Sequence, residues 1–146
     1  MIYIEYEEYK NQYLKLQDSF NHFLTEKERL LTKTLPNAIR YDKDNLHTEP
    51  DGNPLEDYVI ALDEKKIDEN LDRIRKLLED RKLLLECKEM ELRSSRNPYD
   101  RIYTMRFLNG YGIKRICSEM NYSRAQVYRK LSNIKKKKNM RQNETK

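Results

Sequence analysis

The sequence predicts an all-α protein, in which a long antiparallel helical hairpin resembling a coiled coil is followed by a small C-terminal helix-turn-helix module. Only 3 Gly and 4 Pro occur among 146 residues, too few for the many tight turns of a β-sandwich or barrel. Two long stretches repeat apolar residues at alternating steps of three and four, which is the spacing of a coiled-coil seam. The mean hydropathy of −1.07 leaves too little apolar material for one large core.

Residues 1–35 are predicted to form one helix that ends at Pro36, because proline interrupts helical hydrogen bonding. A helix this polar frays when isolated, so its seam needs a partner. The tyrosines of the seam are therefore interpreted as core residues and not as stacking platforms for a ligand. The seam residues are Ile2, Tyr6, Tyr9, Tyr13, Leu16, Phe20, Phe23 and Leu30.

Residues 36–57 lack periodicity and contain three of the four prolines, so they are predicted to form a loop. The loop holds several acidic residues and His47, but it has neither the ligand order of a calcium loop nor the set of ligands that zinc requires. We interpret these residues as solvated charges and predict no metal site.

A second helix is predicted over residues 58–93. Two helices of similar length joined by a loop fit an antiparallel hairpin, in which each buries the seam of the other. Pairing of the same seams between two chains, as in a homodimer, is left open at this point. The second seam consists of Ile67, Leu71, Ile74, Leu78, Leu85 and Leu92.

Residues 94–98 are predicted to be a linker, in which Asn97 caps the next helix and Pro98 takes its first position. Short helices are expected over residues 98–108 and 113–120, and the first of them is expected to use Ile102, Met105 and Phe107 as apolar members. The predicted organisation is thus a hairpin over 1–93, the linker 94–98, a helix-turn-helix module over 99–134 and a frayed basic tail over 135–146.

Charge is distributed unevenly along the chain. Residues 1–98 hold 17 basic and 22 acidic side chains, whereas residues 99–146 hold 13 and 3, a net of −5 against +10. A strongly basic terminal module is typical of a protein that binds a polyanion. A solubilising tail, with KKKK at 135–138, is the alternative explanation.

Residues 113–134 have the layout of a helix-turn-helix. Cys117 takes the place of the small residue that lets the second helix cross the first, and Asn121 suits a turn position with a positive φ. Ser123 and Gln126 form a capping box that opens the last helix, which buries Val127, Leu131 and Ile134.

The exposed face of the last helix is predicted to read duplex DNA in the major groove. Arg129 suits guanine, Gln126 suits adenine and Ala125 suits the methyl group of thymine. The predicted base-contacting residues are Ala125, Gln126, Tyr128 and Arg129. The predicted phosphate-contacting residues are Lys114, Arg115, Ser123, Arg124, Lys130, Lys135, Lys136, Lys137 and Lys138.

The segment RIYTMRFLNGYGIKRICSEMNYSRAQVYRKLSNI resembles the helix-turn-helix of sigma-factor region 4, as found in late transcription regulators of phages of Gram-positive bacteria (the RinA and ArpU type). Residues 39–59 and the charged helix that follows are also similar to a group of small streptococcal phage proteins. The resemblance implies a phage or prophage regulator that acts on promoters. It departs from the pattern at Cys117, where alanine is usual, and in its long, tyrosine-rich first helix. The matching residues are Arg106, Phe107, Gly110, Ile116, Cys117, Met120, Tyr122, Ser123, Val127, Tyr128 and Arg129.

The composition argues against an enzyme, because 2 His and 3 Gly provide no catalytic pairing and no phosphate-cradling loop, and we expect no cofactor. The lack of an apolar run argues against a membrane span, and the 2 cysteines, Cys87 and Cys117, suggest a reducing cytoplasm. The expected partners are duplex DNA and, through the hairpin, RNA polymerase or another protein. A small terminase-like DNA-packaging protein and a module that binds a host protein are the alternatives.

Overall fold

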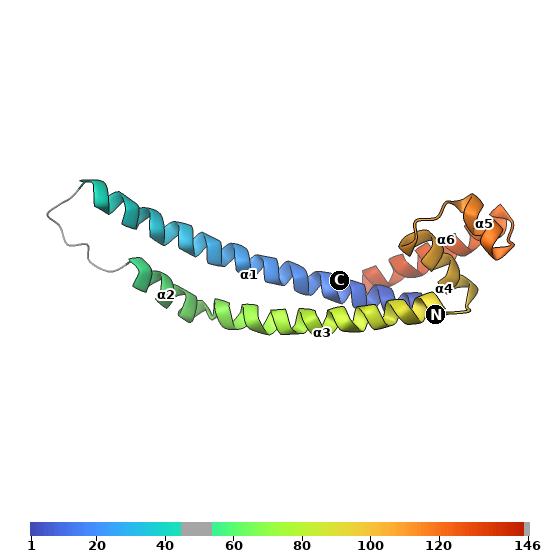
Figure 1. Cartoon of the computed structure of the whole chain (residues 1–146), viewed down its shortest axis with the longest axis horizontal. Coiled ribbons are helices and arrows are strands. Elements are labelled where there is room, and N and C mark those ends of the chain that lie inside the picture. The colour runs from blue at the N-terminus through green and yellow to red at the C-terminus, as the bar shows by residue number, and fades with distance from the viewer. Residues whose placement is uncertain (45–53, 145–146) are drawn as a thin grey trace. The chain divides into compact units, whose positions relative to one another are not determined.

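The computed structural model describes residues 1–44 and 54–144 (Figure 1), which form six α-helices and one π-helical turn and no strand. The all-α prediction is confirmed. Within the described residues, no helix has both the length and the apolar content to cross a membrane. The elements are α1 (Ile2–Asp44), α2 (Pro54–Lys65), α3 (Ile67–Ser94), α4 (Pro98–Tyr103), the π-helical turn η1 (Thr104–Leu108), α5 (Ile113–Met120) and α6 (Arg124–Glu144).

The chain divides into two compact units, and the division differs from the predicted one. Unit 1 consists of residues 1–13 and 81–146, and unit 2 of residues 14–80. The predicted boundary at 94–98 is therefore wrong: this connection lies inside unit 1, and the first 13 residues belong to the C-terminal module. The reason is a set of contacts made by the start of α1.

The N-terminus of α1 is capped by a carboxylate that lies 97 residues after Tyr3 in the sequence. The Asp100 side chain, 1% exposed, accepts hydrogen bonds from the backbone N–H groups of Ile2 (3.3 Å) and Tyr3 (3.0 Å) and from the Ser95 hydroxyl (2.8 Å). The first N–H groups of a helix have no partner within the helix, and its positive end favours an anion. Asp100 thus anchors the start of α1 to the first turn of α4.

The apolar core of unit 1 includes side chains from both ends of the sequence. The ring of Tyr3 stacks on that of Tyr103, with centroids 5.3 Å apart, and Tyr6 meets the same ring edge-on. Tyr6 is buried as its seam position predicts, whereas the burial of Tyr3 was not predicted. The buried members are Tyr3, Tyr6, Leu92, Ile102, Tyr103, Ile116, Val127, Leu131 and Ile134.

Polar contacts continue this packing along the second half of α6, next to the start of α1 (Figure 1). Glu7, itself 8% exposed, accepts a hydrogen bond from the Tyr103 hydroxyl and forms an ion pair with Lys138 at 3.1 Å. Arg141 lies 3.4 Å from Glu8. The predicted frayed tail is therefore wrong, because α6 continues as a helix to Glu144 and is held by these acidic partners.

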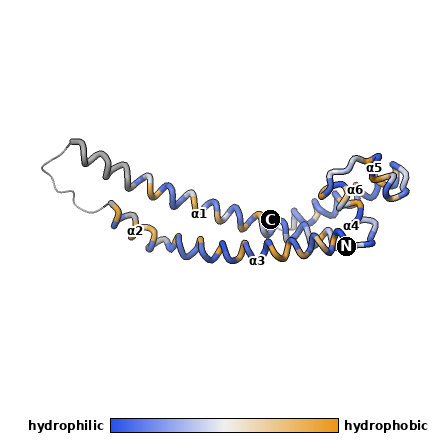
Figure 2. Tube along the Cα trace, in the orientation of Figure 1, coloured by the Kyte–Doolittle hydropathy of each residue, from blue (hydrophilic) through white to orange (hydrophobic). Residues whose placement is uncertain are grey.

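Unit 2 is a second, smaller cluster formed by α1, α2 and α3. Leu30 packs with Ile67 and Leu71, and Lys27 forms an ion pair with Asp68 at 2.8 Å. Apolar positions recur at intervals along α3 between hydrophilic ones (Figure 2), as the predicted seam requires.

Three predicted boundaries need correction. Pro36 lies inside α1, which continues to Asp44, so the predicted end of the first helix at this residue is wrong. The predicted second helix begins earlier, at Pro54, which suits a first helical position, and it is interrupted at Lys66 by a left-handed backbone (φ 49°). The predicted loop 36–57 is too long, because only residues 45–53 separate α1 from α2. These residues, which include His47, lie outside the described part of the chain.

The cap of α4 is as predicted, but the helix does not continue in α-helical form. The Asn97 side chain accepts from the N–H of Tyr99 at 2.9 Å, and Pro98 takes the first position. After Tyr103 the chain widens into η1, where the N–H of Asn109 reaches the carbonyl of Thr104. This shift rotates Phe107, predicted as an apolar member of the helix, to a position that is 41% exposed.

Candidate nucleic-acid interface

The connection between α5 and α6 is a tight turn built around a left-handed residue. Asn121 has φ 54° and ψ 39°, which confirms the predicted positive φ. Its N–H and that of Tyr122 (3.2 Å) both reach the carbonyl of Cys117, so the end of α5 is closed by backbone hydrogen bonds. The side chain of Cys117 is half-buried at the predicted position.

The capping box that opens α6 is confirmed. The backbone N–H of Ser123 donates to Oε1 of Gln126 at 2.9 Å, and the N–H of Gln126 donates to the Ser123 hydroxyl at 3.3 Å. This engagement bears on the predicted adenine contact, because the amide oxygen of Gln126 already accepts a hydrogen bond in the free chain. A bidentate contact with adenine requires Gln126 to release the cap.

One side of α6 is fixed in the core. Val127 and Ile134 are fully buried, Leu131 is 6% exposed, and the facing Ile116 of α5 is fully buried as well. With this side fixed, the predicted base-contacting residues of the first two turns remain on the surface. Ala125, Gln126, Tyr128 and Arg129 are all exposed.

Most of the predicted phosphate-contacting side chains are exposed around this helix. They are Lys114, Arg115, Ser123, Arg124, Lys135, Lys136 and Lys137. Lys130 is half-buried, because its ammonium lies over the rings of Tyr99 (4.3 Å) and Tyr122 (5.7 Å). Lys138 is also half-buried and is engaged with Glu7, which neutralises its charge locally. The prediction of a phosphate contact therefore fits Lys138 least well.

Sequence reasoning missed the aromatic supports of the basic side chains. The guanidinium of Arg115 lies 3.7 Å from the centroid of the Tyr111 ring, a cation–π contact that restricts the side chain at the start of α5. Residues four apart face each other on a helix, so the spacing of Tyr111 and Arg115 could have indicated this contact. Tyr111 precedes α5, however, and the helical rule did not apply to it. The contact of Lys130 with Tyr99 joins residues too distant in sequence for any local pattern to indicate.

The remaining chemistry of the described residues offers little besides this surface. Cys87 and Cys117 are free thiols. Within residues 1–44 and 54–144, no three His, Cys, Asp or Glu side chains are arranged to hold a metal ion.

Comparisons of the chain with known protein families, curated proteins and solved structures find no match. Any functional conclusion therefore depends on the residues themselves.

Proposed function

We propose that the protein is a non-enzymatic, phage-encoded transcription regulator that binds duplex DNA in the cytoplasm through a helix-turn-helix formed by α5 and α6. The observation that carries the proposal is the exposed basic side of α6. Arg129 projects to solvent directly after the capped first turn, while Val127 is fully buried in the core. A rigid backbone that presents a few long polar side chains is what major-groove recognition requires.

Base recognition in this proposal depends first on Arg129. Its guanidinium has the fork of donors that binds O6 and N7 of guanine, while Ala125 offers a methyl group to thymine. Both residues lie on the exposed side of the first half of α6. Gln126 contributes after exchanging its capping hydrogen bond for a base contact, and Tyr128 lies at the edge of the same surface.

Phosphate contacts position the module without reading sequence. The side chain of Arg124 lies directly after the turn, whereas Lys114 and Arg115 lie at the start of α5, where Arg115 is restrained by the ring of Tyr111. Lys135 to Lys137 extend the basic surface along α6 and add salt-dependent affinity. The net charge of residues 99–146, +10 from 13 basic and 3 acidic side chains, supports a polyanionic partner.

The long helices α1 and α3 are proposed to form the hairpin that sets the oligomeric state or contacts RNA polymerase or another protein. They pair within a single chain in each unit, through Glu5 and Lys88 (2.8 Å) in unit 1 and through Lys27 and Asp68 in unit 2. The later residue of α1, Lys27, pairs with the earlier residue of α3, Asp68. This reversed order of the paired residues supports an antiparallel arrangement.

Capture of genomic DNA fragments on the full-length protein at moderate salt, followed by sequencing, tests this proposal. We expect a short enriched motif next to promoters, and its loss with Arg129→Ala. Fragments recovered without a shared motif would contradict sequence recognition. The mass of the protein in solution separates the alternative, because a large ring-shaped oligomer favours a small terminase-like packaging protein, whereas a monomer or dimer favours a regulator.

A further inference from the structure

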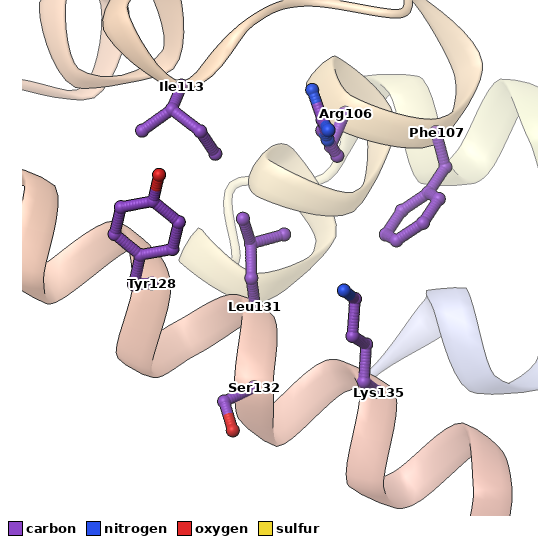
Figure 3. A pocket seen from close by; sticks show the side chains of 7 residues that line it. All are labelled: Arg106, Phe107, Ile113, Tyr128, Leu131, Ser132 and Lys135. Carbon is purple, nitrogen blue, oxygen red and sulfur yellow. The ribbon is translucent and has the colours of Figure 1, made fainter.

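An open groove of about 420 Å³ lies in unit 1 between α6 and the segment that leads from η1 into α5 (Figure 3). Its floor is apolar, formed by Leu131 and Ile113, and its two walls are the aromatic side chains of Phe107 and Tyr128. A volume of this size is ample for one or two apolar side chains of a bound molecule.

Both aromatic walls are exposed, and the ring of Phe107 is also held by a contact with a buried ring. Phe107 is 41% exposed, although its ring packs against that of buried Tyr103 at a centroid distance of 4.9 Å. Tyr128 is 58% exposed. Phe107 lies in the π-helical turn η1 and lines the groove, and such turns are rare and occur frequently at functional sites. Exposed aromatic side chains on a fixed backbone are typical of the centres of protein interfaces.

Two basic residues line the same groove from opposite sides. Arg106 lies beside Phe107 on η1 and is oriented by a hydrogen bond from its guanidinium to the Tyr111 carbonyl at 3.0 Å. Lys135 projects from α6 toward the space between Phe107 and Leu131 (Figure 3). The groove is lined by no carboxylate, so its potential is positive over an apolar surface.

We propose that this groove binds a protein segment that presents an apolar side chain flanked by carboxylates, such as two turns of an acidic amphipathic helix. The apolar side chain enters between Phe107 and Tyr128, and the carboxylates meet Arg106 and Lys135. Charge complementarity selects the acidic partner, and the apolar floor supplies the burial. This groove is separate from the hairpin, and it shares Tyr128 and Lys135 with the proposed DNA-binding surface.

The lining favours a protein segment over a nucleobase. A base buried here needs partners for the several donors and acceptors on its edge. The groove offers only the hydroxyl groups of Ser132 and Tyr128 as uncharged polar partners among side chains. An aliphatic or aromatic side chain needs no such partner.

A titration of the isotope-labelled full-length protein, followed by amide NMR spectra, tests the proposal. The probes are a helical peptide with Leu at a spacing of four and Glu at the flanking positions, and its counterpart with Gln in place of each Glu. We expect the acidic peptide to shift amide signals within 106–113 and 128–135, and to bind about three- to tenfold more tightly than the Gln peptide, as two partly exposed charge pairs imply.

Variants of Arg106 and Lys135 test whether these two side chains cause the preference for the acidic peptide. Arg106→Gln and Lys135→Gln should each weaken the acidic peptide about threefold and leave the Gln peptide unchanged. Lys136→Gln, a neighbouring change outside the groove, should alter neither. The spectra themselves show that each variant is folded. The proposal is overturned if the two peptides bind equally, if neither binds, if the shifts fall elsewhere, or if a DNA duplex and not the acidic peptide shifts the groove amides.

Discussion

At the scale of single residues, Asp100 joins distant parts of the sequence, because its carboxylate accepts a hydrogen bond from the N–H of Tyr3, 97 residues away, in the first turn of α1. Its position near the start of α4 indicates only a local role as a helix-favouring acid. The structure shows that it also satisfies two N–H groups that are otherwise without partners within α1. Loss of this carboxylate leaves them unsatisfied in a part-buried setting.

We therefore expect Asp100→Ala to lower the free energy of unfolding by about 2–3 kcal/mol, which combines a lost helix cap with unsatisfied buried donors. Asp100→Asn keeps one acceptor oxygen and should cost less. Urea denaturation followed by circular dichroism measures both variants. Equal stability of Asp100→Ala and the wild type would show that the start of α1 is not held by this contact.

For the hydroxyl of Tyr3 we predict the opposite effect, since its removal should not lower the free energy of unfolding. It is buried and finds no hydrogen-bond partner among the described residues, while its ring stacks on Tyr103. Tyr3→Phe keeps the ring and removes the unpaired group, so the free energy of unfolding should stay equal or rise by up to about 1 kcal/mol. The same denaturation assay checks it, and a loss of stability would mean that the hydroxyl has a partner, such as an ordered water.

At the scale of elements, the turn between α5 and α6 decides how the proposed reading helix is held. Local sequence predicted it well, because Asn121 and the Ser123–Gln126 box act on their immediate neighbours. The π-helical turn was not predictable in the same way. Its backbone shift rotates Phe107 outward, and no periodicity in the sequence marks such a change.

Asn121→Ala should lower the free energy of unfolding by about 1 kcal/mol, since a left-handed backbone is costly for alanine. Asn121→Gly, which adopts this backbone freely, should be close to neutral or slightly stabilising. Thermal unfolding of the two variants side by side makes the comparison. If alanine is tolerated as well as glycine, residue 121 does not hold a left-handed turn in solution.

At the scale of the whole molecule, the sequence indicates the helices better than their grouping into units. Seam residues such as Ile67 and Leu92 are buried as the three-and-four spacing predicts, because amphipathic periodicity is a local property. The union of the first 13 residues with the C-terminal module depends on pairs such as Glu7 with Lys138, which lie 131 positions apart. No local pattern specifies pairs of that kind. The exposure of the candidate DNA contacts follows from the local periodicity of α6 and was predictable. The ion pair of Lys138 with Glu7 joins distant residues and was not.

The buried tyrosines that join the start of α1 to the C-terminal module lead us to predict that the protein unfolds in alkaline solution. Burial raises the pKa of Tyr103, with a further rise from its hydrogen bond to Glu7, and burial also raises the pKa values of Tyr3 and Tyr6. Their folded pKa values exceed the unfolded value of about 10, so their contribution to stability is complete below pH about 10 and is lost as the pH rises toward the folded values.

Absorbance at 295 nm and circular dichroism, recorded together from pH 9 upward, test this prediction. Tyr3, Tyr6 and Tyr103 should ionise only as the helical signal falls, so part of the absorbance change should coincide with unfolding. Tyr128→Phe, at an exposed position, should leave the pH of unfolding unchanged. Ionisation of all tyrosines in one step near pH 10 with the helices intact would contradict the burial of Tyr3, Tyr6 and Tyr103.

The central claim is that the exposed side of α6 reads bases through Arg129. Its most direct measurement is the ratio of affinities for a captured duplex and for its scrambled counterpart, by fluorescence anisotropy at fixed salt. Arg129→Ala should reduce this discrimination by about 1–3 kcal/mol, whereas joint replacement of Lys135, Lys136 and Lys137 by Gln should weaken both duplexes alike and lower the salt dependence. An equal loss on both duplexes from Arg129→Ala would contradict the claim.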